Sequence, residues 1–588
     1  MDLDHALLDN FGFATFRPGQ REACEAALAG RDALVVMPTG SGKSLCYQLP
    51  ALVSSDLTVV VSPLVALMQD QVEVLTARGF GDRVALVNAQ QDAAANRATI
   101  ERAGSLRLLY VAPERFGSRG FIDALRERAR IGLFVVDEAH CVSQWGHDFR
   151  PDYFRLAERA CAIGARSLMA STATATPRVA LDIVKRLGLR EPASVATGFD
   201  RPNLSFVVVR PSAHEKLGLL LGALRDPASR PAIVYAGTRA GTEELAKSIR
   251  SELGVEALPY HAGIDRDRRA ATQRSFLANE IEVVVATNAF GMGVDKPNVR
   301  TVVHATVPSS LEAYYQEAGR GGRDGQPARA LLLAENRDKA LHVHFIKRDE
   351  LGEQIPGQFV AALAAAAQAD GSFDLAASAL ARGAGCGAET VRSLIAHLAR
   401  AEVIDPLPSA PDRVAGRVVG PLDRRAEGLV RASAAEGVRI RWRQYREIWA
   451  FVESAVCRRR AVLRHFGDRS DPAPTAGCCD ICDPALLPVP AKPKPIRLEG
   501  LDEAIIHVAR TAKPRVGRTT CAEILHGART KKIQRNAYDG LAAYGSSAAM
   551  RRADILTRID ELIASDRLTT TGGTYPVLAV PGGGRTNQ

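Results

Sequence analysis

The stretch Met37-Pro38-Thr39-Gly40-Ser41-Gly42-Lys43-Ser44 decides how the first part of this sequence is expected to fold. It follows a β-branched apolar run and precedes a probable helix at 44–52. Backbone N–H groups of a glycine-rich loop point inward and surround phosphate oxygens, and the helix N-terminus adds partial positive charge. We therefore predict that Lys43 reaches the β- and γ-phosphates of a nucleotide and that Ser44 binds Mg²⁺. The first glycine of the usual pattern is Met37 here, but the turn is made by Thr39, Gly40, Ser41 and Gly42.

A pair of neighbouring carboxylates supports this interpretation. Asp137 and Glu138 directly follow the apolar run 133–136, and His140 lies two positions further on. Open α/β sheets bind ligands at the carboxyl ends of their strands. We therefore predict that Asp137 holds Mg²⁺ and that Glu138 polarises the water that attacks the γ-phosphate. A solvated strand end is the alternative, and the glycine-rich loop in the same domain argues against it.

Two α/β domains in tandem are expected. Short β-branched runs alternate with helical stretches over 1–198, which is typical of buried parallel strands. The alternation starts again after Phe199-Asp200-Arg201-Pro202-Asn203 and ends near residue 348. We therefore predict one domain at 1–198 and a second at 199–348.

The second domain contributes a pair of arginines. In Gln316-Glu317-Ala318-Gly319-Arg320-Gly321-Gly322-Arg323-Asp324, Arg320 and Arg323 are placed on a probable helix start, where positions i and i+3 share a face. Guanidinium groups stabilise the charge that spreads over the γ-phosphate oxygens during phosphoryl transfer. If the two domains face each other, these arginines complete the site across the cleft between them. A solvated arginine–glycine loop is the alternative.

The chain changes character after residue 348. Alanine dominates 349–435 and the strand-like runs stop. Helices at 374–382 and 388–400, with short stretches at 402–404 and 414–419 as a wing, predict an inserted winged-helix-like module. A plain helical spacer is the alternative.

Three further segments follow this module. A long helix at 438–466 is expected within a helical domain at 436–484, and the proline-rich stretch 485–496 predicts an extended linker. Helices followed by a terminal hairpin predict a winged helix at 497–580. The glycine-rich end, 581–588, is expected to be a flexible tail.

Composition limits the class of protein. With 588 residues and a hydrophobic fraction of 46%, the chain is long enough for several globular domains. No stretch approaches the roughly 20 consecutive apolar residues of a membrane span, and the N-terminus lacks a secretory signal pattern. We therefore expect a soluble, cytoplasmic, nucleoid-associated protein with no membrane partner. The net charge of +10 favours a polyanionic partner.

These motifs resemble the RecQ family of superfamily 2 ATP-dependent DNA helicases, over roughly 8–348 and 440–575. Segments similar to the family's strand-contacting, coupling and fifth helicase motifs lie at 62–71, 111–115, 172–175 and 286–297. The resemblance implies two RecA-like domains, a helical zinc-binding platform and winged-helix modules. It also implies 3′-to-5′ unwinding of DNA, driven by ATP and Mg²⁺, in recombination and repair. Repair proteins and single-strand-binding proteins are candidate partners.

The resemblance also implies roles for individual residues. Phe11-Gly12-Phe13 with Phe16-Arg17-Pro18-Gly19-Gln20 looks like the family's adenine-recognition element. Gln20 can hydrogen-bond an adenine edge, and Arg17 or Phe13 can stack on the base. The catalytic residues implied are Lys43, Asp137, Glu138, His140, Gln316, Arg320 and Arg323.

The most family-specific segment is the loop that follows the two carboxylates. It reads Cys141-Val142-Ser143-Gln144-Trp145-Gly146-His147-Asp148-Phe149-Arg150-Pro151. Trp145 and Phe149 offer faces on which bases can stack. Gln144, His147 and Arg150 supply hydrogen bonds or charge, so the loop could report bound single strand to the ATP site. Alternatively, Trp145 and Phe149 belong to the core.

Four of the ten cysteines cluster late in the chain, which indicates a metal site rather than disulfides. The resemblance implies zinc held by Cys457, on the long helix, and by Cys478, Cys479 and Cys482. The family spacing would instead place one ligand at Ala476, and the side chains of neighbouring Cys478 and Cys479 tend to diverge. Three outcomes stay open: four cysteine ligands, three cysteines completed by His465 or Asp480, or no metal.

Cationic segments are candidates for contact with DNA. The winged helix at 497–580 resembles the family's duplex-binding module, and Lys531, Lys532 and Arg535 are expected to contact phosphates without reading sequence. The run 458–460 beside Cys457 either contacts phosphates or forms a solvated face.

We therefore expect an ATP- and Mg²⁺-dependent helicase that loads on single-stranded DNA and opens the adjacent duplex. The enzymatic alternative is an RNA helicase or a duplex translocase that does not unwind. The non-enzymatic alternative is a DNA-binding architectural protein with an inactive ATP fold, and the intact Lys43, Asp137, Glu138 and Arg323 argue against it.

Overall fold

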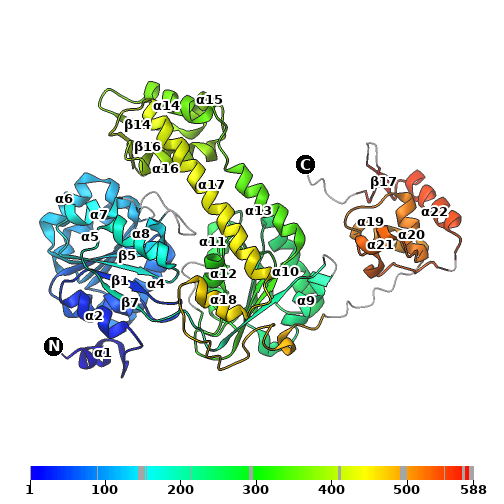
Figure 1. The fold of residues 1–588 in the computed structure, drawn as a ribbon, viewed down its shortest axis with the longest axis horizontal. Coiled ribbons are helices and arrows are strands. Elements are labelled where there is room, and N and C mark those ends of the chain that lie inside the picture. Colours follow the sequence, from blue (N-terminus) through cyan, green and yellow to red (C-terminus); the bar gives the residue numbers. More distant parts are fainter. Residues whose placement is uncertain are drawn as a thin grey trace. The chain divides into compact units, whose positions relative to one another are not determined.

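The computed structural model describes residues 2–88, 91–143, 153, 155–212, 215–290, 296–407, 409, 412–490, 500–548, 550–571 and 576–581 (Figure 1). The chain forms two compact units. The first comprises Met1–Val209, Ala228–Ser248 and Val255–Leu487, and the second comprises Arg210–Pro227, Ile249–Gly254 and Pro488–Gln588.

The first sheet has seven parallel strands in the order β3-β4-β2-β5-β6-β1-β7. Alternate residues of β1 belong to two separate apolar clusters, Leu34 and Val36 to one and Ala33 and Val35 to the other, so both faces of the sheet are covered. The strands are β1 (Ala33–Val36), β2 (Leu57–Val61), β3 (Val84–Val87), β4 (Leu108–Val111), β5 (Ile131–Asp137), β6 (Ser167–Thr172) and β7 (Ala193–Ala196). The helices are α1 (Leu3–Phe11), α2 (Gln20–Leu28), α3 (Leu45–Val53), α4 (Val65–Leu75), α5 (Ala93–Glu101), α6 (Arg119–Arg128), α7 (Leu156–Ala162) and α8 (Pro177–Leu187).

The second sheet has six parallel strands in the order β10-β11-β9-β12-β13-β8. Together the two sheets confirm the prediction of tandem parallel-sheet α/β domains. The strands are β8 (Leu204–Val209), β9 (Ala232–Tyr235), β10 (Ala257–Tyr260), β11 (Val283–Ala286), β12 (Thr301–His304) and β13 (Ala328–Leu333). The helices are α9 (Glu215–Leu224), α10 (Arg239–Leu253), α11 (Arg266–Leu277), α12 (Leu311–Ala318) and α13 (Asn336–Arg348).

The segment after α13 folds around its own small core, and its three-stranded antiparallel sheet, in the order β14-β16-β15, is an element that a plain helical spacer would lack. The helix expected at 374–382 is partly wrong, because Ser372 to Ala376 pair with Arg413 to Arg417 and the helix begins only at Ala377. The elements are α14 (Ile355–Ala366), β14 (Ser372–Ala376), α15 (Ala377–Ala384), α16 (Ala388–Arg400), β15 (Ile404–Leu407) and β16 (Arg413–Val418).

The single helix expected at 438–466 is wrong, because two helices occupy this region. α17 (Arg424–Glu453) begins where the Asp423 carboxylate accepts hydrogen bonds from the first backbone N–H groups, and it ends at Ser454, which has extended backbone (ψ 146). A separate helix, α18 (Arg458–His465), begins after Cys457. The domain boundary predicted at 435/436 therefore falls inside α17, whose Ala426 and Val430 pack into the core of the preceding module.

The C-terminal segment of the second unit contains α19 (Leu501–Thr511), α20 (Arg518–His526), α21 (Lys531–Arg535) and α22 (Arg552–Ala564). The strands β17 (Thr569–Thr570) and β18 (Leu578–Ala579) pair in antiparallel fashion. Ile505, Leu525, Ile555 and Leu578 lie in one apolar core, which joins three of these helices to the hairpin. Within the part of the chain that the structure describes, no helix combines the length and the apolar character needed to span a membrane.

Candidate active site

The glycine-rich loop lies between β1 and α3, as the sequence predicts. Gly40 and Gly42 have φ of 84 and 80, the left-handed region that favours glycine. A Cβ atom on Gly42 would lie 2.6 Å from Nε2 of Gln20, so a larger residue at this position would collide with a side chain that holds the loop.

The two polar residues expected at the adenine hold this loop. Gln20 Nε2 donates hydrogen bonds to the carbonyl oxygens of Ser41 and Gly42, at 3.1 and 3.0 Å. Arg17 Nη1 donates to the Gly40 carbonyl at 2.8 Å, and the Arg17 backbone N–H donates to Gln20 Oε1 at 2.9 Å. The half-exposed ring of Phe13 stacks on Phe11, with centroids 6.5 Å apart. Adenine recognition by these residues stays a prediction.

Lys43 and the two carboxylates form a charged group at the carboxyl end of β5. Lys43 Nζ donates to the Met37 carbonyl at 3.2 Å; burial lowers the pKa of Lys43, against the effect of Glu138 and Asp137. Burial and the neighbouring Glu138 raise the pKa of Asp137 to about 7, although Lys43 opposes them. Glu138 has a φ of 48, a strained conformation for a residue with a side chain and one that often marks a functional position.

His140 links the carboxylates to the neighbouring strand. Its Nδ1 lies 3.3 Å from Oε2 of Glu138 and 3.2 Å from Oγ1 of Thr172, at the end of β6. Burial works against protonation, but contacts with Cys141 and Glu138 raise the pKa of His140 well above its usual value. The histidine is fully buried between these two side chains.

The arginines do not lie on a helix start, which corrects the sequence prediction. α12 ends at Ala318, and Arg320 and Arg323 lie in the turns after it, because glycines at 319, 321 and 322 end the helix. Gln316 lies on α12 itself, and its catalytic role stays a prediction. Arg320 is buried beside Tyr235.

Arg323 meets the glycine-rich loop. Its Cγ lies 3.2 Å from the place that a Cβ on Gly40 would take, and its charge contributes to the lowered pKa of Lys43. Between the two loops is a cavity of about 380 Å³. Its lining comes from both domains: Arg17, Pro38, Thr39, Gly40, Ser41, Arg201, Asn203, Gly322, Arg323, Asp324 and Gly325.

Arg201, which no sequence motif singled out, contacts both loops. Its Nη1 donates to the carbonyl oxygens of Thr39 and Gly319, each at 2.9 Å, and its Nη2 donates to that of Gly321 at 2.8 Å. In the sequence, 199–203 indicates only the place where the second domain begins. Because all the acceptors are backbone carbonyls, no side-chain pattern in the sequence pointed to them.

Most of the aromatic-rich loop that is predicted to bind single-stranded DNA lies outside the described residues. This part contains Gln144, Trp145, His147, Phe149 and Arg150. Nearby Tyr153 is described, and its hydroxyl donates to the Asp137 carbonyl at 3.2 Å.

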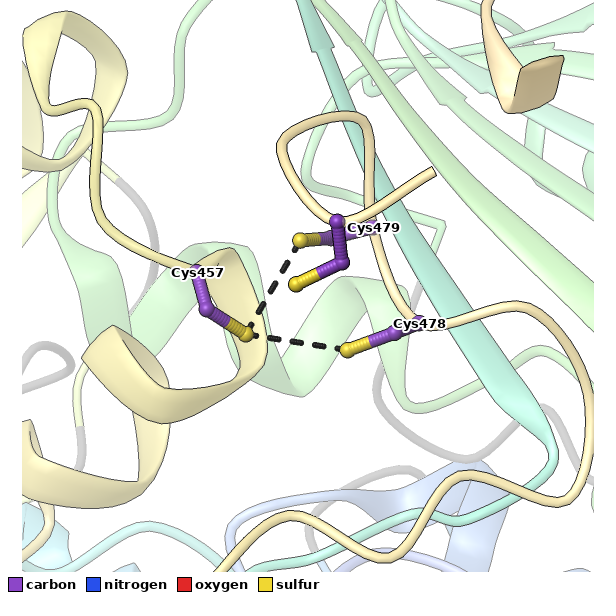
Figure 2. Close-up of side chains that lie close together, drawn as sticks. Cys457, Cys478 and Cys479 are labelled. Atoms are coloured by element: carbon purple, nitrogen blue, oxygen red, sulfur yellow. Dashed lines mark hydrogen bonds between the residues drawn. The ribbon is translucent and has the colours of Figure 1, made fainter. Parts of the chain in front are cut away.

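The four clustered cysteines fit a tetrahedral metal. Their Sγ atoms all lie within 4.8 Å of one another, and that of Cys457 is 3.6 Å from Cys478 and 3.8 Å from Cys479 (Figure 2). A tetrahedron of thiolates about 2.3 Å from zinc has ligands about 3.8 Å apart. The prediction that Cys457 lies on the long helix is wrong. Cys457 is the N-cap residue of α18.

The backbone explains how neighbouring cysteines reach one site. Cys479 forms an isolated parallel bridge with Phe206 of β8, whose N–H donates to the Cys478 carbonyl at 3.1 Å. The other candidate ligands are engaged elsewhere: Asp480 pairs with Arg458 at 3.2 Å, and His465 Nε2 is 2.9 Å from Oε1 of Glu312. The geometry therefore favours four cysteines over the three-cysteine alternatives.

Comparisons with known proteins agree with this arrangement. Residues 17–183 match the family model of the DEAD/DEAH box helicases, and 215–325 that of the helicase conserved C-terminal domain. Residues 424–483, with all four cysteines, match the RecQ zinc-binding model, and 501–586 match the RQC domain. An ATP-dependent DNA helicase RecQ of Bacillus subtilis is 31% identical over 586 residues, which cover 98% of this chain and 82% of the relative. The chain belongs to the RecQ family.

Two other relatives match over the helicase part of this RecQ-family chain. An ATP-dependent DNA helicase RecQ of Pasteurella multocida is 41% identical over 353 residues, 60% of this chain and 54% of the relative. A probable ATP-dependent DNA helicase RecS of Bacillus subtilis is 39% identical over 350 residues, 59% of this chain and 70% of the relative. The chain thus spans about half the length of the Pasteurella multocida relative and 70% of the RecS relative.

The RQC match includes the cations predicted to contact DNA. Lys531, Lys532 and Arg535 are exposed on the short helix α21, whose N-cap Thr530 accepts a hydrogen bond from the Ile533 N–H. Lys532 Nζ also donates to Thr520 Oγ1 at 2.8 Å. Contact of these residues with phosphates stays a prediction.

Proposed function

We propose that this chain is an ATP-dependent DNA helicase that opens duplex DNA with 3′-to-5′ polarity, in recombination and repair. The observation that carries the proposal is the meeting of two loops from different sheets. The glycine-rich loop and Arg323 contact each other, as a site made from both domains requires. Family membership and the names of the relatives support the choice of DNA and of unwinding.

The residues of the first sheet would bind and orient the nucleotide. Lys43 contacts the β- and γ-phosphates, and Ser44 and Asp137 are the groups that would hold Mg²⁺, which neutralises phosphate charge when bound. Glu138 lies at the same strand end and takes a proton from the attacking water. A general base of this kind contributes on the order of 10²- to 10⁴-fold to a rate.

The residues of the second sheet would stabilise the transition state. The side chain of Arg323 lies against the loop that would hold the phosphates. Its guanidinium would stabilise the charge that increases on the γ-phosphate during the reaction. Since it belongs to the other domain, hydrolysis is coupled to the relative position of the domains. The buried contact from Glu138 through His140 to Thr172 supplies a path by which nucleotide state can reach the neighbouring strand.

The four cysteines would hold zinc, which stabilises a fold by cross-linking its ligands. Here the cross-link would join the start of α18 to the edge of β8. The exposed cations of α21 would hold duplex DNA through its phosphates. This assigns a supporting role to the zinc-binding region and a substrate-holding role to the RQC domain.

A strand-separation assay on forked and 3′- and 5′-tailed duplexes, with and without ATP, tests the proposal. We expect unwinding only with ATP and only from a 3′ tail, and loss of unwinding in Lys43→Ala. ATP turnover should rise with single-stranded DNA. Stimulation by RNA alone would make the chain an RNA helicase, and stimulation by duplex without strand separation would make it a translocase. Full unwinding by Lys43→Ala would refute the ATP-driven mechanism.

A further inference from the structure

The guanidinium of Arg201 joins the two halves of the candidate ATP site. It lies at the start of the second domain, directly before β8, with 9% of the residue exposed. One side of its fork donates to Thr39 of the glycine-rich loop and to Gly319, and the other donates to Gly321 and, at 3.3 Å, to Gly322. A single side chain therefore contacts the backbone of both loops.

The chemistry of this contact is specific to arginine. Guanidinium offers five donors in a rigid plane, so one side chain can bind carbonyls that point at it from two directions. Burial lowers the pKa of Arg201, and no carboxylate pairs with it in the described part of the chain. A buried cation without an anion is unfavourable by itself. Arg201 also lies in the lining of the cavity between the loops, and four backbone carbonyls accept its hydrogen bonds.

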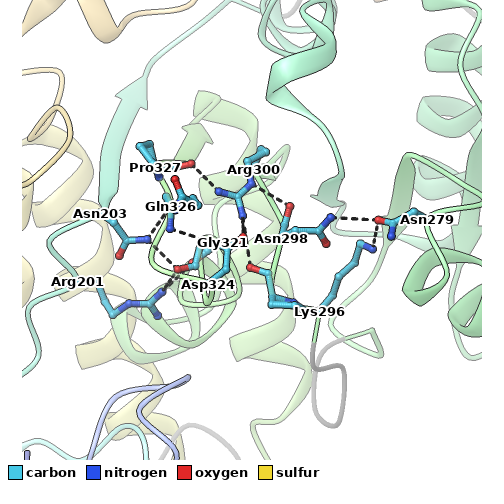
Figure 3. A network of polar contacts seen from close by, with 12 residues as sticks. Arg201, Asn203, Asn279, Lys296, Asn298, Arg300, Gly321, Asp324, Gln326 and Pro327 are labelled. Carbon is cyan, nitrogen blue, oxygen red and sulfur yellow. Dashed lines mark hydrogen bonds and ion pairs between the residues drawn. The ribbon is translucent and has the colours of Figure 1, made fainter. Parts of the chain in front are cut away.

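The loop that carries Arg323 is fixed relative to Arg201 by further bonds. Asn203 Nδ2 donates to the carbonyls of Gly322 and Gln326, at 2.8 and 2.7 Å. Figure 3 shows this network continuing through Asp324 and Arg300. The segment 201–203 and the arginine-bearing loop are thus held together, and Arg201 extends the network to Thr39.

The backbone of Arg201 is itself anchored by α18. Arg459, which is almost fully buried, donates to the carbonyls of Arg201 and Leu204 at 2.7 and 2.6 Å and pairs with Asp200 at 2.5 Å. Phe199 stacks on Phe466, with centroids 4.4 Å apart. The base of the Arg201 side chain therefore has a fixed position while its head bridges the two loops.

We propose that Arg201 is a positioning residue for ATP hydrolysis, which sets the distance between the glycine-rich loop and Arg323. This inference rests on the proposed function, because it concerns the same reaction. Arg201 acts through Arg323, so its removal leaves the binding groups of the nucleotide in place and displaces the group that stabilises the transition state. A displacement of about 1 Å at a reacting centre can lower a rate about 100-fold.

The test compares Arg201→Ala and Arg201→Lys in the full-length protein, with the surface variant Arg128→Ala at the end of α6 as the matched control. We expect DNA-stimulated kcat to fall about 10- to 100-fold in both Arg201 variants, with KM for ATP changed less than about threefold, as for an interaction made in the transition state. Lysine keeps the charge but cannot bridge four carbonyls, so wild-type kcat in Arg201→Lys would overturn the proposal. Thermal unfolding verifies that the variants are folded.

A double variant separates positioning from a general structural role. If Arg201 acts through Arg323, kcat of Arg201→Ala/Arg323→Ala should lie within about threefold of Arg323→Ala alone. If kcat of the double variant falls by the product of the factors measured for the two single variants, the inference is overturned. A wild-type protein without DNA-stimulated turnover would refute the proposed function, whereas normal turnover in Arg201→Ala would refute only the role of Arg201.

Discussion

Replacement of His465 by alanine should destabilise the first unit through a single buried ion pair. His465 on α18 and Glu312 on α12 lie 2.9 Å apart, with 14% and 6% of their side chains exposed. Burial alone would raise the pKa of Glu312, but the hydrogen bond and charge of His465 hold it at about 2. Burial lowers the pKa of His465, but the hydrogen bond and charge of Glu312, together with the charge of Glu447, raise it above its usual value. The variant therefore leaves a buried carboxylate without its cation.

The magnitude follows from these shifts. A fall in the pKa of Glu312 from 4.5 to about 2 corresponds to about 3 kcal/mol in the free energy of unfolding. Loss of one partner from a buried pair typically costs about 3–5 kcal/mol, which agrees with this value. Glu447 lies within 4.8 Å of both groups and adds like-charge repulsion to the stranded carboxylate.

The pH dependence has a definite sign. The contribution of Glu312, whose pKa is depressed, is present above about pH 4.5 and lost as the pH falls towards 2. The pKa of His465 is raised, so the stabilisation that His465 contributes is present below about pH 6.5. This stabilisation is lost as the pH rises through the pKa of His465 in the folded protein. The difference between wild type and His465→Ala should therefore be largest between about pH 4.5 and 6.5.

Scanning calorimetry of the full-length variants at pH 6 and pH 9 measures this difference. His5→Ala is the matched control, because His5 and Asp9 form an ion pair on the surface, with side chains 74% and 59% exposed, which should contribute little. We expect His465→Ala to lower the transition temperature by several degrees at pH 6 and by less at pH 9. A shift no larger than that of His5→Ala, or an equal shift at both pH values, would refute the reasoning.

Three other predictions concern the nucleotide, the metal and DNA. Glu138→Gln should bind ATP normally and turn it over about 10²- to 10⁴-fold more slowly; normal steady-state turnover would remove Glu138 from the role of base. Elemental analysis should find about one zinc per wild-type chain, because four thiolates make one tetrahedral site, and less in Cys478→Ser; full zinc content in that variant would favour three cysteine ligands. Lys531→Glu should weaken duplex binding equally for all sequences and reduce the slope of log affinity against log salt by about 1; a sequence-dependent loss would contradict phosphate contact.

The parts of the fold that the sequence predicted are those with a local pattern. Buried parallel strands appear as continuous β-branched runs, and Gly40 and Gly42 mark a turn in the left-handed region. The glycines around Arg320 also carried a local signal against a helix, which the spacing argument overlooked. The break between α17 and α18 had a weaker signal, because the residues that separate the two helices, 454–457, include neither glycine nor proline.

Long-range backbone contacts could not be predicted in this way. The acceptors of Arg201 lie 162 and 118 positions away in the sequence, and those of Arg459 about 258 positions away. Every residue has a backbone carbonyl group. An arginine that binds backbone carbonyls therefore does not require a particular type of residue elsewhere in the sequence, and no pattern reveals its partners. Such residues become visible only when the strand order has brought the loops together.

The same contacts give the short helix α18 a role that neither motif alone suggests. Its N-cap is a cysteine of the candidate metal cluster, its second residue anchors the backbone of Arg201, and its last residue pairs with α12. α12 runs directly into the loop that carries Arg320 and Arg323. One helix of eight residues therefore contacts the supports of both the bridging arginine and the arginines proposed to be catalytic, and it joins the cysteine cluster to the candidate ATP site. A metal site that only stabilised its own loop would not need this placement.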